Sequence, residues 1–518
     1  MTRHLPRPGL SRRGLLKGAS ALGASSLLLP FGMHAAMAQP RTGGVLRVAI
    51  GAGAQTDGYD PALWTNDFCA FFATARHGFL TEIGPDGQLI GEVAQSWDTA
   101  DAINWVLKIR AGIRFHSGKA LTADDVIASI NHHRGTTSPV GPLVAQIVSL
   151  TADGMTLKVT LAAANVDFPL LLADYNLPIL PASDGRLDLQ SADGCGPYRV
   201  LSYFPGVEAR LERHPDYWKP GRAHVDAVQI FTIADSAARL NALQTGMVDL
   251  IDGVAPAQVA ALKRQPGLKV LATRGTRHAV LAMDSRVAPL HDPHLRRALK
   301  FAIDRQALVD DLLLGHGHIA NDHPIAPTNR YFNSELPQTD YDPDRARFHL
   351  AQAGVASVDL TLVAAEAAFV GAVQTARMFA GTAKQAGINL KVSPAVDDQF
   401  WGQVWRQTRF CSSVSRGRPT EDWIFSTAYA GGAPLNDGHW TNPRFDTLLG
   451  WARSELSEGP RQEMYWEMQA ICAQDGAVIA PVFADYLTAF TDKLMHDDAV
   501  SNTGTLDGFR AAERWWFA

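Results

Sequence analysis

The sequence predicts an α/β protein with two lobes, because two strand–helix–strand units lie far apart in the chain. In the first unit, we predict apolar strands at 225–233 and 247–251, with a helix at 236–244 between them. In the second unit, we predict strands at 358–364 and 388–392, with a helix at 369–386 between them. Gly246 and Gly387 stand where each helix should end in a left-handed residue. Each unit needs a sheet and a core of its own, which favours two lobes.

Local signals define the neighbouring elements. An alternation of apolar and polar residues predicts a strand at 45–50. Asp235 or Ser236 would cap the first helix, and Asp292 would cap another helix that has Pro293 at its first position. This other helix carries an apolar stripe at helical spacing, formed by Leu295, Ala298, Leu299 and Ala302.

Residues 1–38 have the composition of an export signal. Five basic residues and no acidic one precede a short apolar run, and Ala36-Met37-Ala38 forms a small-residue cleavage site. The pair Arg12-Arg13 resembles the twin-arginine export motif, with an ordinary secretory signal as the alternative. No cysteine stands at the cleavage site. We therefore expect a periplasmic protein that is cleaved after about Ala38 and carries no lipid anchor.

The charge of the remaining chain excludes one class of partner. The full sequence has a net charge of -5, and removal of residues 1–38 changes this to -10. An acidic chain without a basic run is a poor nucleic-acid binder, so we expect no nucleic-acid partner. No later segment is apolar for long enough to cross a bilayer.

Signatures of several enzyme classes are missing. Gly51-Ala52-Gly53-Ala54 follows the first strand, but Thr56 stands where the dinucleotide fingerprint needs a third glycine. The sequence also lacks the phosphate-loop, zinc-protease and serine-hydrolase motifs. We therefore expect no cofactor and no catalysis, and an exported enzyme is the alternative from a different class.

Three long segments are similar to one family. Residues 194–218, GCGPYRVLSYFPGVEARLERHPDYW, fit a Gly-Pro turn, a hairpin and an aromatic pair. A second segment begins at Glu92 and reads EVAQSWDTADAINWVLKIRAGIRFHSGKALTADDVIASI. A third begins at His291 and reads HDPHLRRALKFAIDRQALVDDLLLGHG. Together they resemble the family 5 solute-binding proteins of ABC importers, which capture peptides, nickel chelates and related solutes.

The resemblance covers nearly all of the chain after about residue 40 and implies a two-lobed periplasmic-binding-protein fold of the type II kind, with the ligand cleft between the lobes. Lobe I would be discontinuous, an extra domain would be inserted into it, and lobe II would follow. The implied ranges are 41–76, 207–283 and 496–518 for lobe I, 77–206 for the inserted domain and 284–495 for lobe II.

The resemblance also implies a function. The chain would be a receptor, expected to be monomeric, that captures a small solute and delivers it to ABC permease subunits in the inner membrane. A peptide or an amino-acid-derived compound is the expected solute. A metal chelate of the nickel type, an opine or a sugar is the alternative.

The segment 410–429 contains the main candidate for solute recognition. Within eight positions it carries five charged or aromatic residues, Arg416, Arg418, Glu421, Asp422 and Trp423. In peptide-binding relatives the corresponding loop holds a carboxylate that pairs with the free ammonium group of the ligand. The resemblance gives this role to Glu421 or Asp422, and Arg416 or Arg418 could form a bidentate contact with a ligand carboxylate. The alternative is a solvated loop with an internal salt bridge.

Two further groups are candidates for ligand contact. The first, Thr65, Asn66 and Asp67, matches a lobe I loop that contacts ligand in relatives, and a capping or turn role is its alternative. The second is Trp401, which could form the floor of the cleft together with Trp405 on the same helix face. Aromatic residues at this spacing more often belong to a core.

Two departures weaken a dipeptide assignment. The loop reads RGRPTEDW rather than the Asp-Pro-Asp-Asn-like wording of peptide binders. The arginine expected near the start of the 369–386 helix is missing, with Val373 and Gln374 at about that place. Neither departure affects the receptor assignment.

Metal binding and disulfides are not specified by the sequence. His316, His318 and His323 are candidate metal ligands, but the sequence does not assign a common direction to alternate residues of a glycine-rich loop, so we predict no metal site. The four cysteines lie far apart and form no CxxC pair, which leaves both disulfides and buried free thiols open. They are Cys69, Cys195, Cys411 and Cys472.

Overall fold

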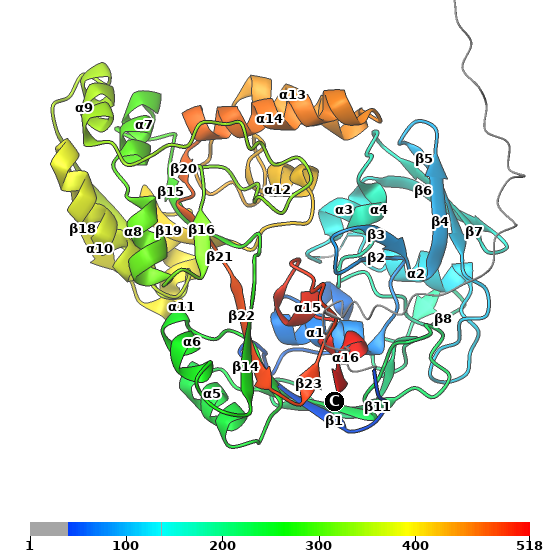
Figure 1. The fold of residues 1–518 in the computed structure, drawn as a ribbon. Helices are drawn as coiled ribbons and strands as arrows, with labels where there is room; N and C mark the ends of the chain where they lie inside the picture. The colour runs from blue at the N-terminus through cyan, green and yellow to red at the C-terminus, as the bar shows by residue number, and fades with distance from the viewer. Residues whose placement is uncertain (1–39, 136) are drawn as a thin grey trace, which may run out of the picture. The chain divides into compact units, whose positions relative to one another are not determined.

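The structure is a computed structural model that describes residues 40–135 and 137–518. The predicted export signal at 1–38 lies outside these residues, so its cleavage and its twin-arginine character stay predictions. Two sheets of seven strands and one sheet of four strands organise the described chain (Figure 1).

The first large sheet defines lobe I. Its spatial order is β10 (Tyr198–Phe204), β11 (Glu208–Arg213), β12 (Ala227–Thr232), β1 (Val45–Ile50), β13 (Leu250–Ile251), β22 (Tyr486–Thr491) and β14 (Leu268–Thr273). Its helices are α1 (Asp67–Arg76), α5 (Ser236–Gln244) and α6 (Pro256–Leu262). β1 is parallel to both β12 and β13. Asp235 caps α5, and Gly246 follows it with a φ of 73°. The first predicted unit is thereby confirmed, with a shorter second strand than expected.

The second large sheet defines lobe II. Six strands run in the order β16 (Gly317–Ile319), β21 (Val482–Ala484), β15 (His278–Met283), β19 (Phe410–Ser415), β17 (Val358–Ala364) and β18 (Ile388–Pro394). The seventh, β20 (Val478–Ile479), pairs with β15. β17 and β18 are parallel and are joined by α10 (Ala372–Ala383), and Gly387 ends the helical segment with a φ of 82°. The second predicted unit is confirmed.

Helices cover the lobe II sheet. Asp292 caps α7 (Pro293–Phe301), and the apolar stripe of this helix lies in the core of the lobe. α7 packs against α9 (Pro343–Gln352), and α13 (Pro443–Ser454) packs against α14 (Glu458–Asp475) (Figure 1). Shorter helices are α8 (Arg305–Ala307), α11 (Asp397–Gln399) and α12 (Glu421–Ala428).

Two short links, which we call the crossings, join the large sheets. One is residues 274–277 between β14 and β15, and the other is Asp485 between β21 and β22. They lie side by side, because the amide of Ala484 donates a hydrogen bond to the carbonyl oxygen of Arg277 at 3.0 Å. The chain therefore passes from one lobe to the other before the expected boundaries at residues 283 and 495. Likewise, β10 belongs to the lobe I sheet although it precedes the expected end of the inserted domain at residue 206. The cause is non-local pairing: β22 is antiparallel to both β13 and β14.

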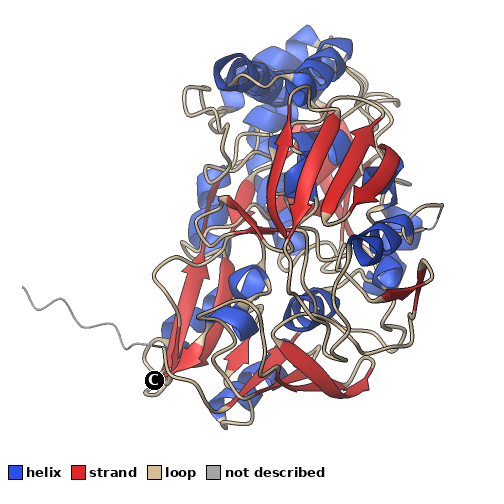
Figure 2. Cartoon of the chain, turned by 90° about the vertical axis from the view of Figure 1, so that its right-hand side faces the viewer, coloured by secondary structure: helices blue, strands red, loops and turns tan. Residues whose placement is uncertain are grey.

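The inserted domain has an antiparallel four-stranded sheet, which Figure 2 shows from the side on which it lies. Its order is β4 (Ala94–Thr99), β5 (Asn104–Ile109), β7 (Thr156–Leu161) and β6 (Ile147–Asp153). The helices α2 (Ala123–Asn131), α3 (Gly141–Ala145) and α4 (Phe168–Leu171) accompany it. Leu107, Phe115 and Phe168 are fully buried in its core. The two-stranded sheets of the chain are β2 (Thr81–Ile83) with β3 (Leu89–Gly91), β8 (Ala182–Ser183) with β9 (Arg186–Leu187), and β23 (Leu494–Met495) with β24 (Trp516–Phe517).

The end of the chain is fixed by a buried cluster of charges, which we call the C-terminal ion cluster. It lies beside the short helices α15 (Thr505–Gly508) and α16 (Ala511–Arg514). Its members are Glu82, Glu92, Lys219, Arg510, Glu513 and Arg514. The Nζ atom of Lys219 lies 2.6 Å from a carboxylate oxygen of Glu82 and 2.9 Å from one of Glu92. Buried charges persist only when they are paired, so the cluster ties the start of the inserted domain to the C-terminus.

Candidate functional site

The 416–423 loop follows β19 and lies against the first crossing. Gly417 has a φ of 68°, and a Cβ atom on it would lie 2.1 Å from the hydroxyl oxygen of Thr276. Only glycine permits both this backbone conformation and this approach. Thr420 then begins α12, because its hydroxyl accepts a hydrogen bond from the amide of Trp423 at 3.2 Å.

Arg416 reaches from lobe II to the start of α1 in lobe I. Its Nη1 atom lies 3.4 Å from the carbonyl oxygen of Thr65 and 3.8 Å from a carboxylate oxygen of Asp67. The side chain of Arg416 is 58% exposed, so water competes with both contacts. Three of the predicted site residues, Thr65, Asp67 and Arg416, therefore lie together.

Asn66 has partners inside its own lobe. Its side-chain oxygen accepts a hydrogen bond from the amide of Cys69 at 3.0 Å and caps α1. Its side-chain nitrogen donates to both carboxylate oxygens of Asp57, at 2.9 and 3.0 Å. The capping role that the sequence left open is thus present, and it shapes the turn that positions Thr65 and Asp67.

Arg418 is the least satisfied charge of the loop. Its Nη1 atom donates to the carbonyl oxygen of Gly417 at 3.0 Å, and its guanidinium carbon lies 5.4 Å from the centre of the Trp423 ring. Its Nε atom is buried and has no hydrogen-bond partner within the described residues. Burial lowers the pKa of Arg418, while the negative charge of Asp174 acts in the opposite direction.

Glu421 points into the interior of lobe II. It is 2% exposed, and a carboxylate oxygen accepts a hydrogen bond from the amide of Tyr331 at 2.8 Å. Burial raises the pKa of Glu421 to about 7, because the charged form loses its hydration.

Asp422 is paired with a helix of the same lobe. A carboxylate oxygen lies 3.0 Å from Nε of Arg453 in α13. Burial raises the pKa of Asp422, and the charge of Arg453 opposes this shift. The neighbouring Arg461 in α14 lies 2.7 Å from Asp167, which precedes α4 of the inserted domain. Asp422 is thus part of the packing beside the joint between lobe II and the inserted domain.

The two tryptophans of the prediction lie in different surroundings. Trp423 packs against the core of the inserted domain although it belongs to lobe II. Trp401 is 45% exposed on a π-helical turn at Phe400–Val404, and its ring centre lies 5.7 Å from that of Trp405. Trp405 donates its indole N–H to Asp437 at 2.8 Å, which fixes the pair within lobe II.

Three residues near Arg418 were missed by the sequence analysis. Asp174 and Tyr175 come from the inserted domain, and Tyr486 begins β22 directly after the second crossing. Each contributes to the electrostatic surroundings of Arg418. No local motif marks them, because only the tertiary fold brings the three segments together.

The histidines of the possible metal site lie in different environments. His318 stacks on Phe483 with ring centres 5.0 Å apart, and burial lowers its pKa to about 4. His323 is 1% exposed, and burial lowers its pKa to about 3. Within 40–135 and 137–518, no three His, Cys, Asp or Glu side chains form a group that could hold a metal ion. The four cysteines are buried and unpaired.

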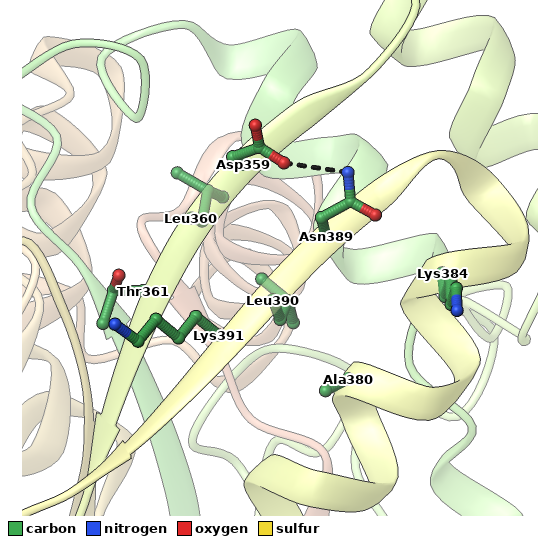
Figure 3. A pocket seen from close by; sticks show the side chains of 8 residues that line it. All are labelled: Asp359, Leu360, Thr361, Ala380, Lys384, Asn389, Leu390 and Lys391. Carbon is green, nitrogen blue, oxygen red and sulfur yellow. Dashed lines mark hydrogen bonds between the residues drawn. The ribbon is translucent and has the colours of Figure 1, made fainter.

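Two hollows lie in lobe II outside the 416–423 loop. One, of about 530 Å³, lies along β17, β18 and α10, where Asp359 accepts a hydrogen bond from Asn389 at 2.8 Å (Figure 3). Its polar side chains are mostly exposed to solvent, including Lys384 and Lys391. The other, of about 320 Å³, lies beside His323. Neither includes a predicted site residue.

Solved structures define the class to which this fold belongs. DppA from Helicobacter pylori, an ABC transporter-associated periplasmic binding protein in complex with the peptide STSA, matches with a TM-score of 0.77 and 20% identity over 92% of this chain and 99% of that chain. NikZ from Campylobacter jejuni, in complex with Ni(L-His), matches with a TM-score of 0.77 and 19% identity over 91% and 99%. The fold is therefore that of the periplasmic binding proteins, as predicted. No helix in the described part of the chain is long and apolar enough to cross a membrane.

The sequence comparisons identify the family. Residues 88–432 match the model of the bacterial extracellular solute-binding proteins, family 5, middle part. The chain belongs to this family of solute-binding proteins. Di/tripeptide-binding protein 2 of Pseudomonas aeruginosa is 26% identical over 508 residues, which cover 88% of this chain and 92% of that protein.

Proposed function

We propose that this chain is the periplasmic receptor of an ABC importer, which closes its two lobes over a small solute and delivers it to the permease subunits. One observation carries this proposal: the 416–423 loop of lobe II contacts the start of α1 in lobe I, beside the two crossings. Solutes commonly bind between two α/β lobes that close around them. The receptor acts as a monomer, performs no chemistry and binds no nucleic acid.

A peptide or an amino-acid-derived compound is the proposed solute. The names of relatives support this class, since the Pseudomonas aeruginosa relative is a di/tripeptide-binding protein and the Helicobacter pylori neighbour holds a peptide. The nickel–histidine complex of the Campylobacter jejuni neighbour supports a metal chelate as the alternative. An opine or a sugar belongs to the same range of alternatives.

We propose that the predicted site residues divide into two groups. Thr65, Asp67, Arg416, Arg418 and Trp423 would surround the solute, with Trp401 at a more distant part of the cleft. Asn66, Glu421 and Asp422 would hold the shape of the site through their hydrogen bonds and ion pair within the protein.

Recovery of the bound solute tests the receptor proposal. Protein purified from the native periplasm should carry one small molecule per chain, identified by mass spectrometry. Adding that molecule to the stripped protein should raise the melting temperature, because binding to the folded state alone stabilises it by RT ln(1 + [L]/Kd). Chemical turnover of the molecule would overturn the receptor proposal, and a metal-dependent shift would support the chelate alternative.

Export to the periplasm is a separate part of the proposal. Residues 1–38 would be removed after about Ala38, and the pair Arg12-Arg13 would direct the chain to the twin-arginine pathway. Replacing both arginines with lysine should leave the protein in the cytoplasm, as measured by cell fractionation. A wild-type cytoplasmic protein that retains Met1 would contradict the export proposal.

A further inference from the structure

We propose that the 416–423 loop recognises an anionic group of the solute, of the carboxylate type, through Arg418 with help from Arg416, and that it does not bind an ammonium group. This inference rests on the proposed receptor function and names the charge of the solute that the receptor takes.

The acidic residues of the loop are occupied within the protein. Glu421 and Asp422 are each 2% exposed and begin α12 with their carboxylates in the interior of lobe II. Glu421 accepts from the amide of Tyr331 at 2.8 Å, and Asp422 pairs with Arg453 at 3.0 Å. An ammonium group of a solute could reach either carboxylate only by displacing these partners from the packed interior.

The arginines of the loop, in contrast, have few hydrogen-bond partners within the described part of the chain. A guanidinium group has five N–H donors. In the described part of the chain, Arg418 has no carboxylate within ion-pair distance, and its donors make one bond, to the adjacent carbonyl of Gly417. Among the described residues, the polar contacts of the Arg416 side chain are the long ones to Thr65 and Asp67. The loop therefore presents unused positive charge.

The surroundings of Arg418 favour an anion over water. Its Nε atom is buried, and the ring of Trp423 covers one face of its guanidinium group. A charge-assisted hydrogen bond is stronger in such a place than at an exposed surface, because water screens it less. Tyr175 of the inserted domain and Tyr486 of lobe I lie near Arg418, and both phenols are neutral because burial raises the pKa of each. An anion at Arg418 would thus lie where all three parts of the chain meet.

One competing partner is present. Asp174 lies close enough to influence the charge of Arg418, but no ion pair joins them, and a carboxylate oxygen of Asp174 accepts from the amide of Asn176 at 2.8 Å. If Asp174 were the intended partner of Arg418, the arginine would serve stability rather than recognition. The experiment separates these two roles.

A charge-sorted binding assay tests the proposal. A small-molecule extract of bacterial cells is split, at a pH above the ammonium pKa values of about 8 to 10.4, into fractions retained by anion-exchange resin, retained by cation-exchange resin, and retained by neither. At this pH a zwitterionic peptide has lost its ammonium charge and enters the anion-exchange fraction through its carboxylate. The stripped full-length mature protein is then melted with each fraction. Only the anion-exchange fraction should raise its melting temperature. A shift by the cation-exchange or neutral fraction alone would overturn the proposal, and the absence of any shift would overturn the receptor function on which it rests.

Variants of the loop and one surface control test whether Arg418 binds the anionic group. With the active molecule purified from the anionic fraction, Arg418→Gln should lower affinity by at least about 30-fold, as expected when one partner of a desolvated charge pair is removed. Arg418→Lys keeps the positive charge but loses the two parallel N–H donors of the guanidinium group, so its affinity should lie between those of wild type and Arg418→Gln. Arg444→Gln, in an exposed pair with Glu467, is the control, and its affinity should stay within about threefold of wild type. A loss of affinity in Glu421→Gln as large as that in Arg418→Gln would place an ammonium group at this carboxylate and overturn the proposal. Equal affinity of Arg418→Gln and wild type, with a lower melting temperature of the unliganded variant, would assign Arg418 to stability.

Discussion

The C-terminal ion cluster and the 416–423 loop use charge in opposite ways. In the cluster, five of the six charged side chains are buried and Lys219 is 13% exposed. Each has oppositely charged partners at short distance, as Arg510 does with Glu92 and Glu513, both at 2.9 Å. In the loop, the two acidic residues are buried and bonded, but the partly buried Arg418 has no carboxylate within ion-pair distance among the described residues. The difference shows that the protein neutralises the buried charges of the cluster with its own side chains, whereas it provides no such partner for Arg418.

Removing an arginine from the C-terminal ion cluster should have the largest effect on the free energy of unfolding. Arg510→Ala leaves Glu82, Glu92 and Glu513 buried with fewer positive partners, and we expect a loss of about 3–5 kcal/mol in the free energy of unfolding. Urea denaturation measures this, and Arg510→Lys should recover part of it. The exposed Arg444→Ala is the matched control and should leave the midpoint nearly unchanged. Similar losses for Arg444→Ala and Arg510→Ala would contradict the distinction between paired buried charges and surface charges.

The buried carboxyl group of Glu421 should make the stability of the protein depend on pH. Because the pKa of Glu421 is about 7 in the folded state and about 4.3 in an unfolded chain, the folded protein binds the proton more tightly. Its contribution is therefore fully present below about pH 4 and is lost as the pH rises through 7. Between pH 5 and pH 8, the free energy of unfolding of wild type should fall by on the order of 2–3 kcal/mol relative to that of Glu421→Gln. The amide oxygen of the variant can still accept the hydrogen bond from Tyr331. Urea denaturation at both pH values checks this, and parallel pH profiles of the two proteins would count against an ionisable Glu421.

The exposed member of the loop should show the smallest effect on stability. Arg416→Ala removes only the contacts at 3.4 and 3.8 Å to Thr65 and Asp67, so the free energy of unfolding should change by about 0–1 kcal/mol. Calorimetry with the purified solute should show a smaller loss of affinity than for Arg418→Gln. A larger loss for Arg416→Ala would move the centre of recognition from Arg418 to the start of α1.

The sequence predicted those elements that are defined by neighbouring residues. The limits of β1, α5 and β17 agree with the predicted ranges, because caps, glycine stops and periodicity are local signals. The lobe boundaries could not be placed in this way, since β22 joins the lobe I sheet through pairing with strands more than two hundred residues earlier in the chain.

The sequence could propose the 416–423 loop as the candidate site but could not give the division of roles within it. The composition of 416–423 identified the loop. It could not show that the helix begins at Glu421, which turns the acidic residues inward and leaves the arginines before the helix. Nor could it show that Tyr175 and Tyr486, from other parts of the fold, lie near Arg418.

The two crossings make lobe II an insertion whose two ends meet. The chain leaves lobe I after Thr273 and returns at Tyr486, and the hydrogen bond between Ala484 and Arg277 holds the two ends together. Folding of lobe II therefore brings β14 and β22 side by side and removes most of the loop-closure entropy of their pairing. A segment with adjacent ends can also be exchanged as a unit without stretching its host. Lobe II, with its own core and the 416–423 loop, is thus a module that recombination could replace, provided that the new segment supplies partners for the inserted domain, as Trp423 and Arg461 do here.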